Sequence, residues 1–134
     1  MNLIPGSSAT ASALQAHTVR LETIAQNIAN ADTTRGPDGK PYQRQMVSFE
    51  SELDAFGQTC VKIAGVESDR SPGTLVSNPG HPHADENGMV QMPNVHPSIE
   101  MVDMIAASRA YEANLSVAKT AHQMALKTLE IGRA

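Results

Sequence analysis

The chain has 134 residues, a formal net charge of −4, no tryptophan, two phenylalanines and two tyrosines. So few aromatic side chains exclude a large aromatic core. The acidic balance, without any cluster of Lys and Arg, excludes a surface that binds nucleic acid by neutralising phosphates. The single cysteine, Cys60, cannot form an internal disulfide. No apolar run approaches the length of a signal-peptide core or a membrane span, so we expect neither a cleavable signal peptide nor a transmembrane helix.

Proline and glycine divide the chain into three parts. Seven of the eight prolines and seven of the nine glycines lie between Gly36 and Pro97. Because both residues interrupt regular helices, the flanks are predicted to be helical and the middle to be rich in turns. We therefore predict a mainly α fold with a small β insert. It has an amino-terminal helix within 1–35, a β-rich and turn-rich middle segment over 36–97 and a carboxy-terminal helix within 98–134, and the two terminal helices pair as a coiled coil.

The first helical segment carries a narrow apolar seam. Its members follow one another in steps of three and four, which keeps their side chains on one side of a helix. Ser7 or Ser8, after a Pro-Gly pair, is predicted to cap the amino end of this helix, and Ser98 that of the last helix. The seam consists of Leu14, His17, Leu21, Ile24, Ile28 and Ala31.

The middle segment contains four short runs of β-favouring residues, at 42–50, 60–68, 74–77 and 88–92. Turn sequences rich in Gly, Pro, Asn and Asp separate these runs, which favours antiparallel pairing. We expect one small antiparallel β unit with little apolar volume.

One loop of the middle segment has the residue types of a metal site. The sequence HPHADE brings together His81, His83, Asp85 and Glu86. A catalytic zinc site takes three protein ligands and a structural one takes four, and no other His or Cys lies at a suitable spacing. Because these residues lie among Pro, Gly and Asn, we favour a turn whose side chains bond to the backbone, and we expect no metal and no cofactor. A metal-dependent hydrolase built on this loop is the alternative hypothesis.

Other signs of catalysis are missing from the sequence. It contains neither the G-x-S-x-G nucleophile motif nor the G-x-x-x-x-G-K-S/T phosphate-binding loop. We therefore predict no catalytic residues, no small-molecule substrate and no enzyme activity.

The last helical segment carries a longer seam than the first. The same alternation of three and four continues through residues 101–129. Further apolar residues beside it, among them Ile105, Val117 and Met124, make the apolar surface wider than one partner helix would cover, so more than one neighbour is predicted. We define the predicted assembly seam as the central residues of both helices: Leu14, Leu21, Ile24, Ile28, Met104, Tyr111, Leu115 and Leu129.

Four segments together resemble one protein family. The segment LQAHTVRLETIAQNIANADTT is similar to the amino-terminal signature of bacterial flagellar axial proteins, the rod and hook family. The segments GPDGKPYQRQMVSFE, PGHPHADENGMVQMPNV and the helix around SRAYEAN resemble, in that order, the FlgC type of basal-body rod protein of the proximal rod. The resemblance covers nearly the whole chain. The family signature is carried by Asn27, Ala29, Asn30, Thr33, Arg109, Tyr111 and Asn114.

This resemblance implies a structural subunit of the flagellar basal body, in the part of the rod that crosses the periplasm. It implies helical assembly with other rod subunits and with copies of itself, contacts with the rod-to-ring adaptor and the membrane ring, and transmission of torque. It also implies passage through the flagellar type III export gate without a cleavable signal. For that step, Phe49 and Leu53 in FESEL match a short Phe-x-x-x-hydrophobic export element. The alternative is that these two residues simply belong to the small β core.

A free-standing coiled-coil adaptor, or a secretion accessory protein, is the alternative function, because the same seams would serve it. The two hypotheses differ in solution. The adaptor would form a stable small oligomer, whereas a rod subunit with two narrow seams would depend on its neighbours to order its helices.

Overall fold

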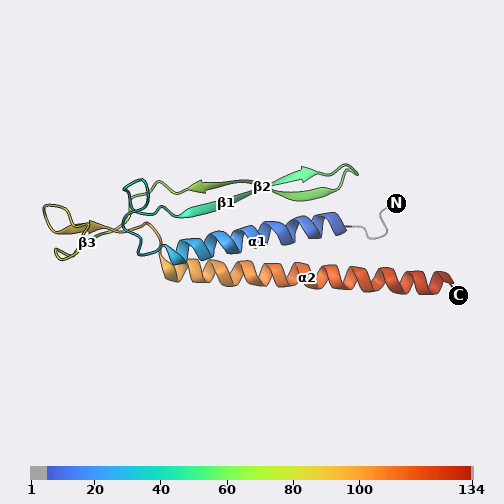
Figure 1. The fold of residues 1–134 in the computed structure, drawn as a ribbon. Helices are drawn as coiled ribbons and strands as arrows, with labels where there is room; N and C mark the ends of the chain where they lie inside the picture. The colour runs from blue at the N-terminus through green and yellow to red at the C-terminus, as the bar shows by residue number, and fades with distance from the viewer. Residues whose placement is uncertain (1–5, 134) are drawn as a thin grey trace.

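The computed structural model describes residues 6–133. It confirms the predicted mainly α fold with short antiparallel strands, because two long helices flank four strands in the sequence (Figure 1). The elements in chain order are α1 (Ser7–Ala29), β1 (Gln45–Leu53), β2 (Thr59–Ser68), β3 (Leu75–Ser77), β4 (Met89–Gln91) and α2 (Pro97–Arg133).

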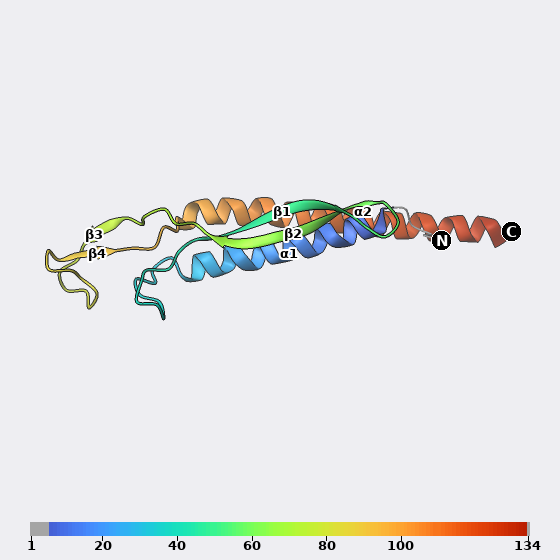
Figure 2. The same cartoon turned by 90° about the horizontal axis from the view of Figure 1, so that it is seen from above.

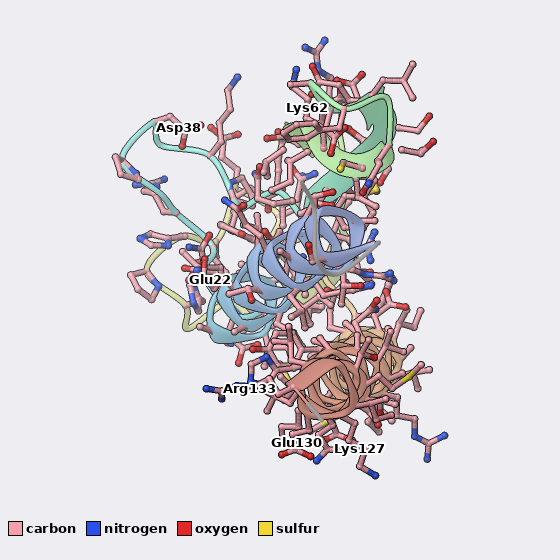
Figure 3. All side chains as sticks on the ribbon, turned by 90° about the vertical axis from the view of Figure 1, so that its right-hand side faces the viewer. Glu22, Asp38, Lys62, Lys127, Glu130 and Arg133 are labelled. Carbon is pink, nitrogen blue, oxygen red and sulfur yellow. The ribbon has the colours of Figure 1, made fainter. Side chains whose placement is uncertain are left out.

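Helix α1 is the middle layer of the molecule. The hairpin of β1 and β2 packs on one side of it, and α2 packs antiparallel to it on the opposite side (Figure 1). In the view along the helices, Lys62 marks the hairpin, and Lys127 and Glu130 mark the side of α2 that faces away from α1 (Figure 3). Because a single helix separates the two outer layers, each outer layer has a face that α1 cannot cover.

The buried apolar core of residues 6–133 is small. A core of this size leaves a large share of the tertiary contacts to hydrogen bonds between segments. The buried apolar residues come from α1, β4, the loop before α2 and α2 itself: Ala16, Ile24, Val90, Val95 and Ala107.

The predicted serine caps are wrong at both helices. Gly6 is the N-cap residue of α1, with a φ of 81° and no side-chain cap hydrogen bond. The Ser8 hydroxyl instead donates to Asp54 Oδ2 at 2.9 Å, because the first turn of α1 lies against the hairpin turn. In α2, Pro97 is the first helical residue, a position where the missing N–H costs nothing. The backbone N–H groups of Ile99 and Glu100 donate to the His96 carbonyl oxygen. The predicted cap of α2 therefore lies inside the helix.

The turn of the β1–β2 hairpin is held by one carboxylate. Strand β1 pairs antiparallel with β2 along its whole length, with one irregular step in the register. In the turn, Asp54 Oδ1 accepts the backbone N–H groups of Phe56 and Gln58, each at 2.8 Å. These hydrogen bonds, chiefly the one from Gln58, lower the pKa of Asp54, and the Ser8 hydroxyl adds to the effect. The turn therefore keeps an ionised acceptor at neutral pH.

Strands β3 and β4 form a second, separate sheet. They pair antiparallel over three residues each and lie beyond the end of the helices (Figure 2). Each of the four predicted β runs overlaps a strand, but the strands form two two-stranded sheets rather than one unit. The reason is that β1 and β2 lie along α1, whereas the segments 69–74 and 92–96 carry the chain past the end of the helix to β3 and β4.

Helix α2 is longer than its partner. With 23 and 37 residues, α1 and α2 are about 35 and 55 Å long at a rise of about 1.5 Å per residue. Helix α2 therefore continues past the start of α1 (Figure 1). All side chains from residue 126 to residue 133 are exposed, so this part of α2 has no cover within the described chain.

His17 lies where α1 meets the hairpin. Its ring meets the Phe49 ring edge to face, with 6.1 Å between the ring centroids. Its Nδ1 atom is buried without a hydrogen-bond partner. Burial, and secondarily the charge of Arg20, lower the pKa of His17 below its ordinary value of 6.5. Because the unfolded histidine takes up a proton more readily than the folded one, the stability it contributes is present above that ordinary value and is lost as the pH falls.

Acid should therefore weaken the contact between α1 and the hairpin. We expect the free energy of unfolding to fall as the pH decreases from about 7 to about 5, and His17→Leu to make this fall smaller because leucine binds no proton. Urea titrations followed by circular dichroism at each pH would measure it. The remaining fall is assigned to His83, whose pKa is also lowered, chiefly by burial. An unchanged dependence in His17→Leu would contradict the assignment.

Candidate assembly surfaces and the junction between the helices

Asn27, near the end of α1, holds three parts of the chain together. Its Oδ1 accepts the backbone N–H of Gln45 at 2.8 Å and the hydroxyl of Tyr42 at 3.0 Å. Its Nδ2 donates to the Gln45 carbonyl oxygen at 2.8 Å and to Glu100 Oε2 at 3.0 Å. Both polar atoms of this buried amide are thus satisfied. Their partners are the start of β1 and the first turn of α2.

Glu100 is a buried carboxylate, with only 1% of its surface exposed. Besides Asn27, it accepts a hydrogen bond from Arg44 Nε, and Arg44 Nη2 donates to Asp103 Oδ2 at 3.2 Å. A buried carboxylate is stable only when its charge is balanced and its oxygens are bonded. Arg44 and Asn27 are therefore what allows Glu100 to lie there. We name this set the junction cluster: Asn27, Tyr42, Arg44, Glu100 and Asp103.

The junction cluster is also tied to the loop before α2. Asn94 Oδ1 accepts the backbone N–H of Arg44 at 2.7 Å, and its Nδ2 donates to the Asp69 carbonyl oxygen at 2.9 Å. The Asp69 N–H donates to the Arg44 carbonyl oxygen at 2.8 Å. Burial, and then the charge of Glu100, raise the pKa of Tyr42, which keeps its hydroxyl available as a donor. The start of β1 is therefore held from both sides.

The signature residues at the end of α1 form a hydrogen-bonded turn. Asn30 is the C-cap residue; its Nδ2 donates to the Gln26 carbonyl oxygen at 2.9 Å, and its Oδ1 accepts the Thr33 hydroxyl at 3.1 Å. The Thr33 carbonyl oxygen accepts the backbone N–H of Tyr42 at 3.0 Å. Ala29 is exposed. This turn directs the chain back along α1 and into β1.

The signature residues of α2 lie apart from that turn. Asn114 is half-buried and its Nδ2 donates to the Ala110 carbonyl oxygen at 2.9 Å, within the helix. Tyr111 is half-buried and Arg109 is exposed. No hydrogen bond of the described residues joins these three to the junction cluster, so the two parts of the signature occupy different sites.

The predicted assembly seam is mostly protected from solvent within one chain. Ile24 is buried, whereas Leu129, in the overhang of α2, is 52% exposed. The middle of the seam is thus enclosed and its end is open. The half-buried members are Leu14, Leu21, Ile28, Met104, Tyr111 and Leu115.

The protected row of α2 coincides only in part with the predicted row. Met101 and His122, which follow the alternation of three and four through residues 101–129 but are not in the assembly seam, are exposed. Steps of three and four occur in both rows, so the pattern alone could not distinguish them. In the structure, the protected row includes Glu100, whose charge is bound inside. It also includes small alanines, which allow the two helices to approach closely. The protected row is Glu100, Met104, Ala107, Tyr111, Asn114, Ala118, Ala121 and Ala125, and Asp103, Ser108, Ala110 and Leu115 beside it are also half-buried.

A large apolar surface of α2 is not covered by α1. Ile105, Val117 and Met124, which were predicted to widen the apolar surface, are 55%, 58% and 64% exposed. No helix within residues 6–133 is long and apolar enough to span a membrane. Exposed apolar patches of this kind mark protein–protein contacts. The other exposed large apolar residues of α2 are Ile99, Met101, Val102, Leu126, Leu129 and Ile131.

The two residues of the predicted export element lie on β1. Phe49 is 38% exposed and Leu53 is 67% exposed. Phe49 packs at the ring of His17, whereas Leu53 ends the strand next to the hairpin turn. Phe49 therefore has a packing contact in the folded chain. A test of its role in export has to distinguish a loss of export from a loss of this contact.

The HPHADE loop is held by internal hydrogen bonds. Asp85 Oδ1 accepts the backbone N–H of Asn87 at 2.9 Å, and His81 Nδ1 accepts the backbone N–H of His83 at 3.1 Å. His83 Nδ1 lies 2.8 Å from Thr34 Oγ1, which joins this loop to the loop after α1. Within residues 6–133, no group of three or more His, Cys, Asp or Glu residues is placed to hold a metal ion. The bonds of Asp85 and His81 thus hold the loop's own turns, and the contact with Thr34 ties the loop to the segment after α1.

Most of the junction cluster carries no sequence signal that would predict it. Glu100 occupies the first turn of α2, where a carboxylate is expected on any exposed helix because of the helix dipole. Tyr42 and Arg44 precede a strand, with no distinguishing spacing. Only Asn27 had a signal, as a residue of the family signature.

Replacing Asn27 should open the junction. Asn27→Ala leaves Glu100 and the Gln45 backbone with unpaired polar groups, so we expect a loss of about 2–4 kcal/mol in the free energy of unfolding. Asn27→Asp should cost at least as much, because it places a second carboxylate beside Glu100. The matched control is Asn114→Ala, whose amide bonds only within α2, with an expected cost below about 1 kcal/mol. Equal losses in the two alanine variants, measured by urea unfolding, would contradict the role of the junction.

Two family descriptions match the chain. Residues 9–37 match "Flagella basal body rod protein", and residues 86–131 match "Flagellar basal body rod FlgEFG protein C-terminal". The first match contains most of α1 and the hydrogen-bonded turn that follows it. The second contains β4 and nearly all of α2.

Individual relatives cover almost the whole chain. The chain is 48% identical to the flagellar basal-body rod protein FlgC of Salmonella typhimurium over 124 residues. These residues cover 91% of this chain and 92% of the relative. It is 38% identical to the protein of the same name from Bacillus subtilis, with coverages of 92% and 94%. For that of Borreliella burgdorferi the identity is 37%, and 98% of each chain is covered. These matches confirm the resemblance found in the sequence. The chain therefore belongs to the FlgC family of flagellar basal-body rod proteins, which are structural subunits rather than enzymes.

Proposed function

We propose that the chain is a subunit of the proximal rod, which assembles helically with other rod subunits and copies of itself in the periplasm and transmits torque. The observation that carries this proposal is the exposed apolar surface of α2, outside the row that α1 covers. A chain with so small a core and so much exposed apolar surface gains stability when neighbours bury that surface. The family supports the same conclusion.

Packing alone is sufficient for such a role. Helix α2 is a continuous element about 55 Å long, supported along part of its length by α1. When neighbouring subunits cover its exposed faces, the side chains interdigitate at the density of a protein interior, which deforms little and transmits strain. Torque then passes through many contacts, and no chemical step is required.

Helices α1 and α2 pair as a short coiled coil within this assembly. The support is the regular alternation of four and three residues in the protected row of α2, which is the spacing that keeps one side of a helix against its partner. Ala107, Ala118 and Ala121 in that row favour a close approach of the two helices.

The chain reaches the rod unfolded, through the flagellar type III export gate, and lies near the rod-to-ring adaptor and the membrane ring. The small core supports this route, because a chain that buries few apolar residues unfolds at modest cost. Phe49 and Leu53 serve as the element read by the gate, since unfolding of β1 exposes both completely.

Leu21 and Leu115 test the assembly role. In Leu21→Asp and Leu115→Asp a charge replaces a half-buried leucine, which should cost roughly 3 kcal/mol or more in helix packing. Both variants should be secreted, because export uses the unfolded chain, yet both should be absent from isolated basal bodies, with motility lost. Ser116→Asp, at an exposed position of α2, is the control and should assemble normally.

The contrary results are equally specific. Incorporation of either leucine variant at the wild-type level would remove the support for the assembly seam. A wild-type chain that forms a stable small oligomer at micromolar concentration and is absent from basal bodies would favour the free-standing adaptor.

Phe49 and Phe56 form a matched pair for the export role. Phe56 lies in the hairpin turn, 79% exposed and outside the FESEL match. We expect Phe49→Ala to lower the amount of secreted chain while the cellular amount stays unchanged, and Phe56→Ala to leave secretion normal. Because Phe49 also packs on His17, the free energy of unfolding of both purified variants is measured in parallel. Normal secretion of a destabilised Phe49→Ala chain would assign Phe49 to the folded core alone.

A further inference from the structure

The turn before β4 contains an Asn-Gly pair at the surface of the molecule. Among the asparagines of the chain, only Asn87 is followed by glycine. Asn87 is exposed, and its turn belongs to the small sheet beyond the end of the helices (Figure 2). Strands β3 and β4 pair over only three residues each, so few contacts oppose a local opening of this turn.

This pair has the atoms for a reaction within the chain. The backbone nitrogen of Gly88 attacks the side-chain carbonyl carbon Cγ of Asn87, and a new C–N bond closes a succinimide ring. The bond from Cγ to Nδ2 breaks, and the side-chain nitrogen leaves as ammonia with the proton of the Gly88 N–H. Water then opens the ring at either carbonyl carbon and leaves aspartate or isoaspartate at position 87. Because glycine has no side chain to obstruct the attack, an Asn-Gly pair reacts more readily than other pairs that begin with asparagine.

We propose that Asn87 is a deamidation site of this chain, and that the closed β3–β4 turn holds the reaction back. The proposal goes beyond the assembly of the subunit, because it concerns a covalent change that limits how long an open chain stays intact.

Asp85 closes the turn with both its backbone and its side chain. The Gly88 N–H donates to the Asp85 carbonyl oxygen at 2.9 Å, and the Asp85 N–H donates to the Met89 carbonyl oxygen at 2.8 Å. Asp85 Oδ1 accepts the backbone N–H groups of Asn87 at 2.9 Å and of Met89 at 2.8 Å. The attacking nitrogen is thus engaged in a hydrogen bond, and the backbone on both sides of it is fixed. The turn therefore has to open before Gly88 attacks.

The fold requires the glycine that makes this pair reactive. Gly88 has a φ of 73°, a conformation that residues with a side chain rarely adopt. A Cβ atom at this position would also lie 2.9 Å from Pro79 Cγ. A bulkier residue would therefore disturb the turn, so the chain retains the reactive pair and depends on Asp85 to hold it closed.

Deamidation alters the hairpin in which it takes place. The isoaspartate product routes the backbone through the former side chain and lengthens it by a methylene group just before Gly88. The Gly88 carbonyl oxygen, which accepts the Asn78 N–H at 2.9 Å, and the buried Val90 follow directly after the altered bond. Either product also adds a carboxylate beside Asp85 and Glu86. We therefore expect the modified chain to close the β3–β4 turn less often.

Peptide mapping by mass spectrometry measures the reaction at each asparagine of the full chain, kept in mildly alkaline buffer that favours loss of the Gly88 proton. The folded wild-type chain should deamidate slowly at Asn87, and the same chain unfolded in guanidinium chloride should react fastest there. Asp85→Ala should react about ten times faster than the wild type under native conditions, because hydrogen bonds to a carboxylate favour the closed turn by about that factor. Asp85→Asn, whose side-chain oxygen still accepts both N–H groups, should stay near the wild-type rate.

Two other asparagines are internal controls. Asn94 is followed by Val95, whose side chain obstructs the attack, and Asn78 is followed by Pro79, whose nitrogen carries no proton. Both should react far more slowly than Asn87 in the unfolded chain. The proposal is overturned if Asn87 reacts no faster than Asn94 in the unfolded chain, or if the folded wild-type and Asp85→Ala chains react at the same rate.

Amide hydrogen exchange tests the effect on the hairpin. Asn87→Gln keeps the backbone N–H that bonds to Asp85 but removes the reactive side chain. After equal storage, the isolated deamidated wild-type chain should exchange the amide hydrogens of residues 75–91 faster than the Asn87→Gln chain. Equal exchange in the two chains would show that the modification leaves the turn closed, contrary to the expected damage.

Discussion

One buried carboxylate holds the arrangement of this chain. Glu100 can lie inside only because Asn27 and Arg44 bind it, and these two residues come from the end of α1 and from the start of β1. Removal of either partner would leave an uncompensated charge in the interior. The end of α1, the start of β1 and the first turn of α2 are therefore fixed to one another at a single point, from which the hairpin, α1 and α2 extend side by side (Figure 1).

The two ends of α2 consequently differ in character. At the junction the helix is tied by directional hydrogen bonds, whereas residues 126–133 extend past α1 and are exposed on every side. With so few buried apolar residues, the chain leaves much of its apolar surface exposed. Such a division gives a subunit that unfolds at modest cost and becomes more stable once neighbours bind its folded form, because binding to the folded state alone shifts the unfolding equilibrium.

The HPHADE loop illustrates why residue types are a weaker guide than geometry. Two histidines and two acidic residues within a few positions resemble a ligand set, but Asp85 accepts backbone N–H groups of its own turn and His83 pairs with Thr34 across two loops. Dense Pro, Gly and Asn around them favoured a turn in advance, because short polar side chains in such sequences bond to the local backbone. The pairing with Thr34, which is distant in sequence, had no signal.

The sequence by itself determined the helical flanks, the location of the short strands and the family, because these depend on local features: where Pro and Gly fall, the spacing of apolar residues and the signature around Asn27. Only the tertiary structure decided which row of α2 faces α1, that Ser8 binds the hairpin turn rather than capping its helix, and that the strands form two sheets. The physical reason is that spacings of three and four run along more than one row of the same helix, and a hydroxyl or carboxylate has several possible partners nearby. The choice among them depends on contacts between residues far apart in the chain, above all those that balance the charge of Glu100.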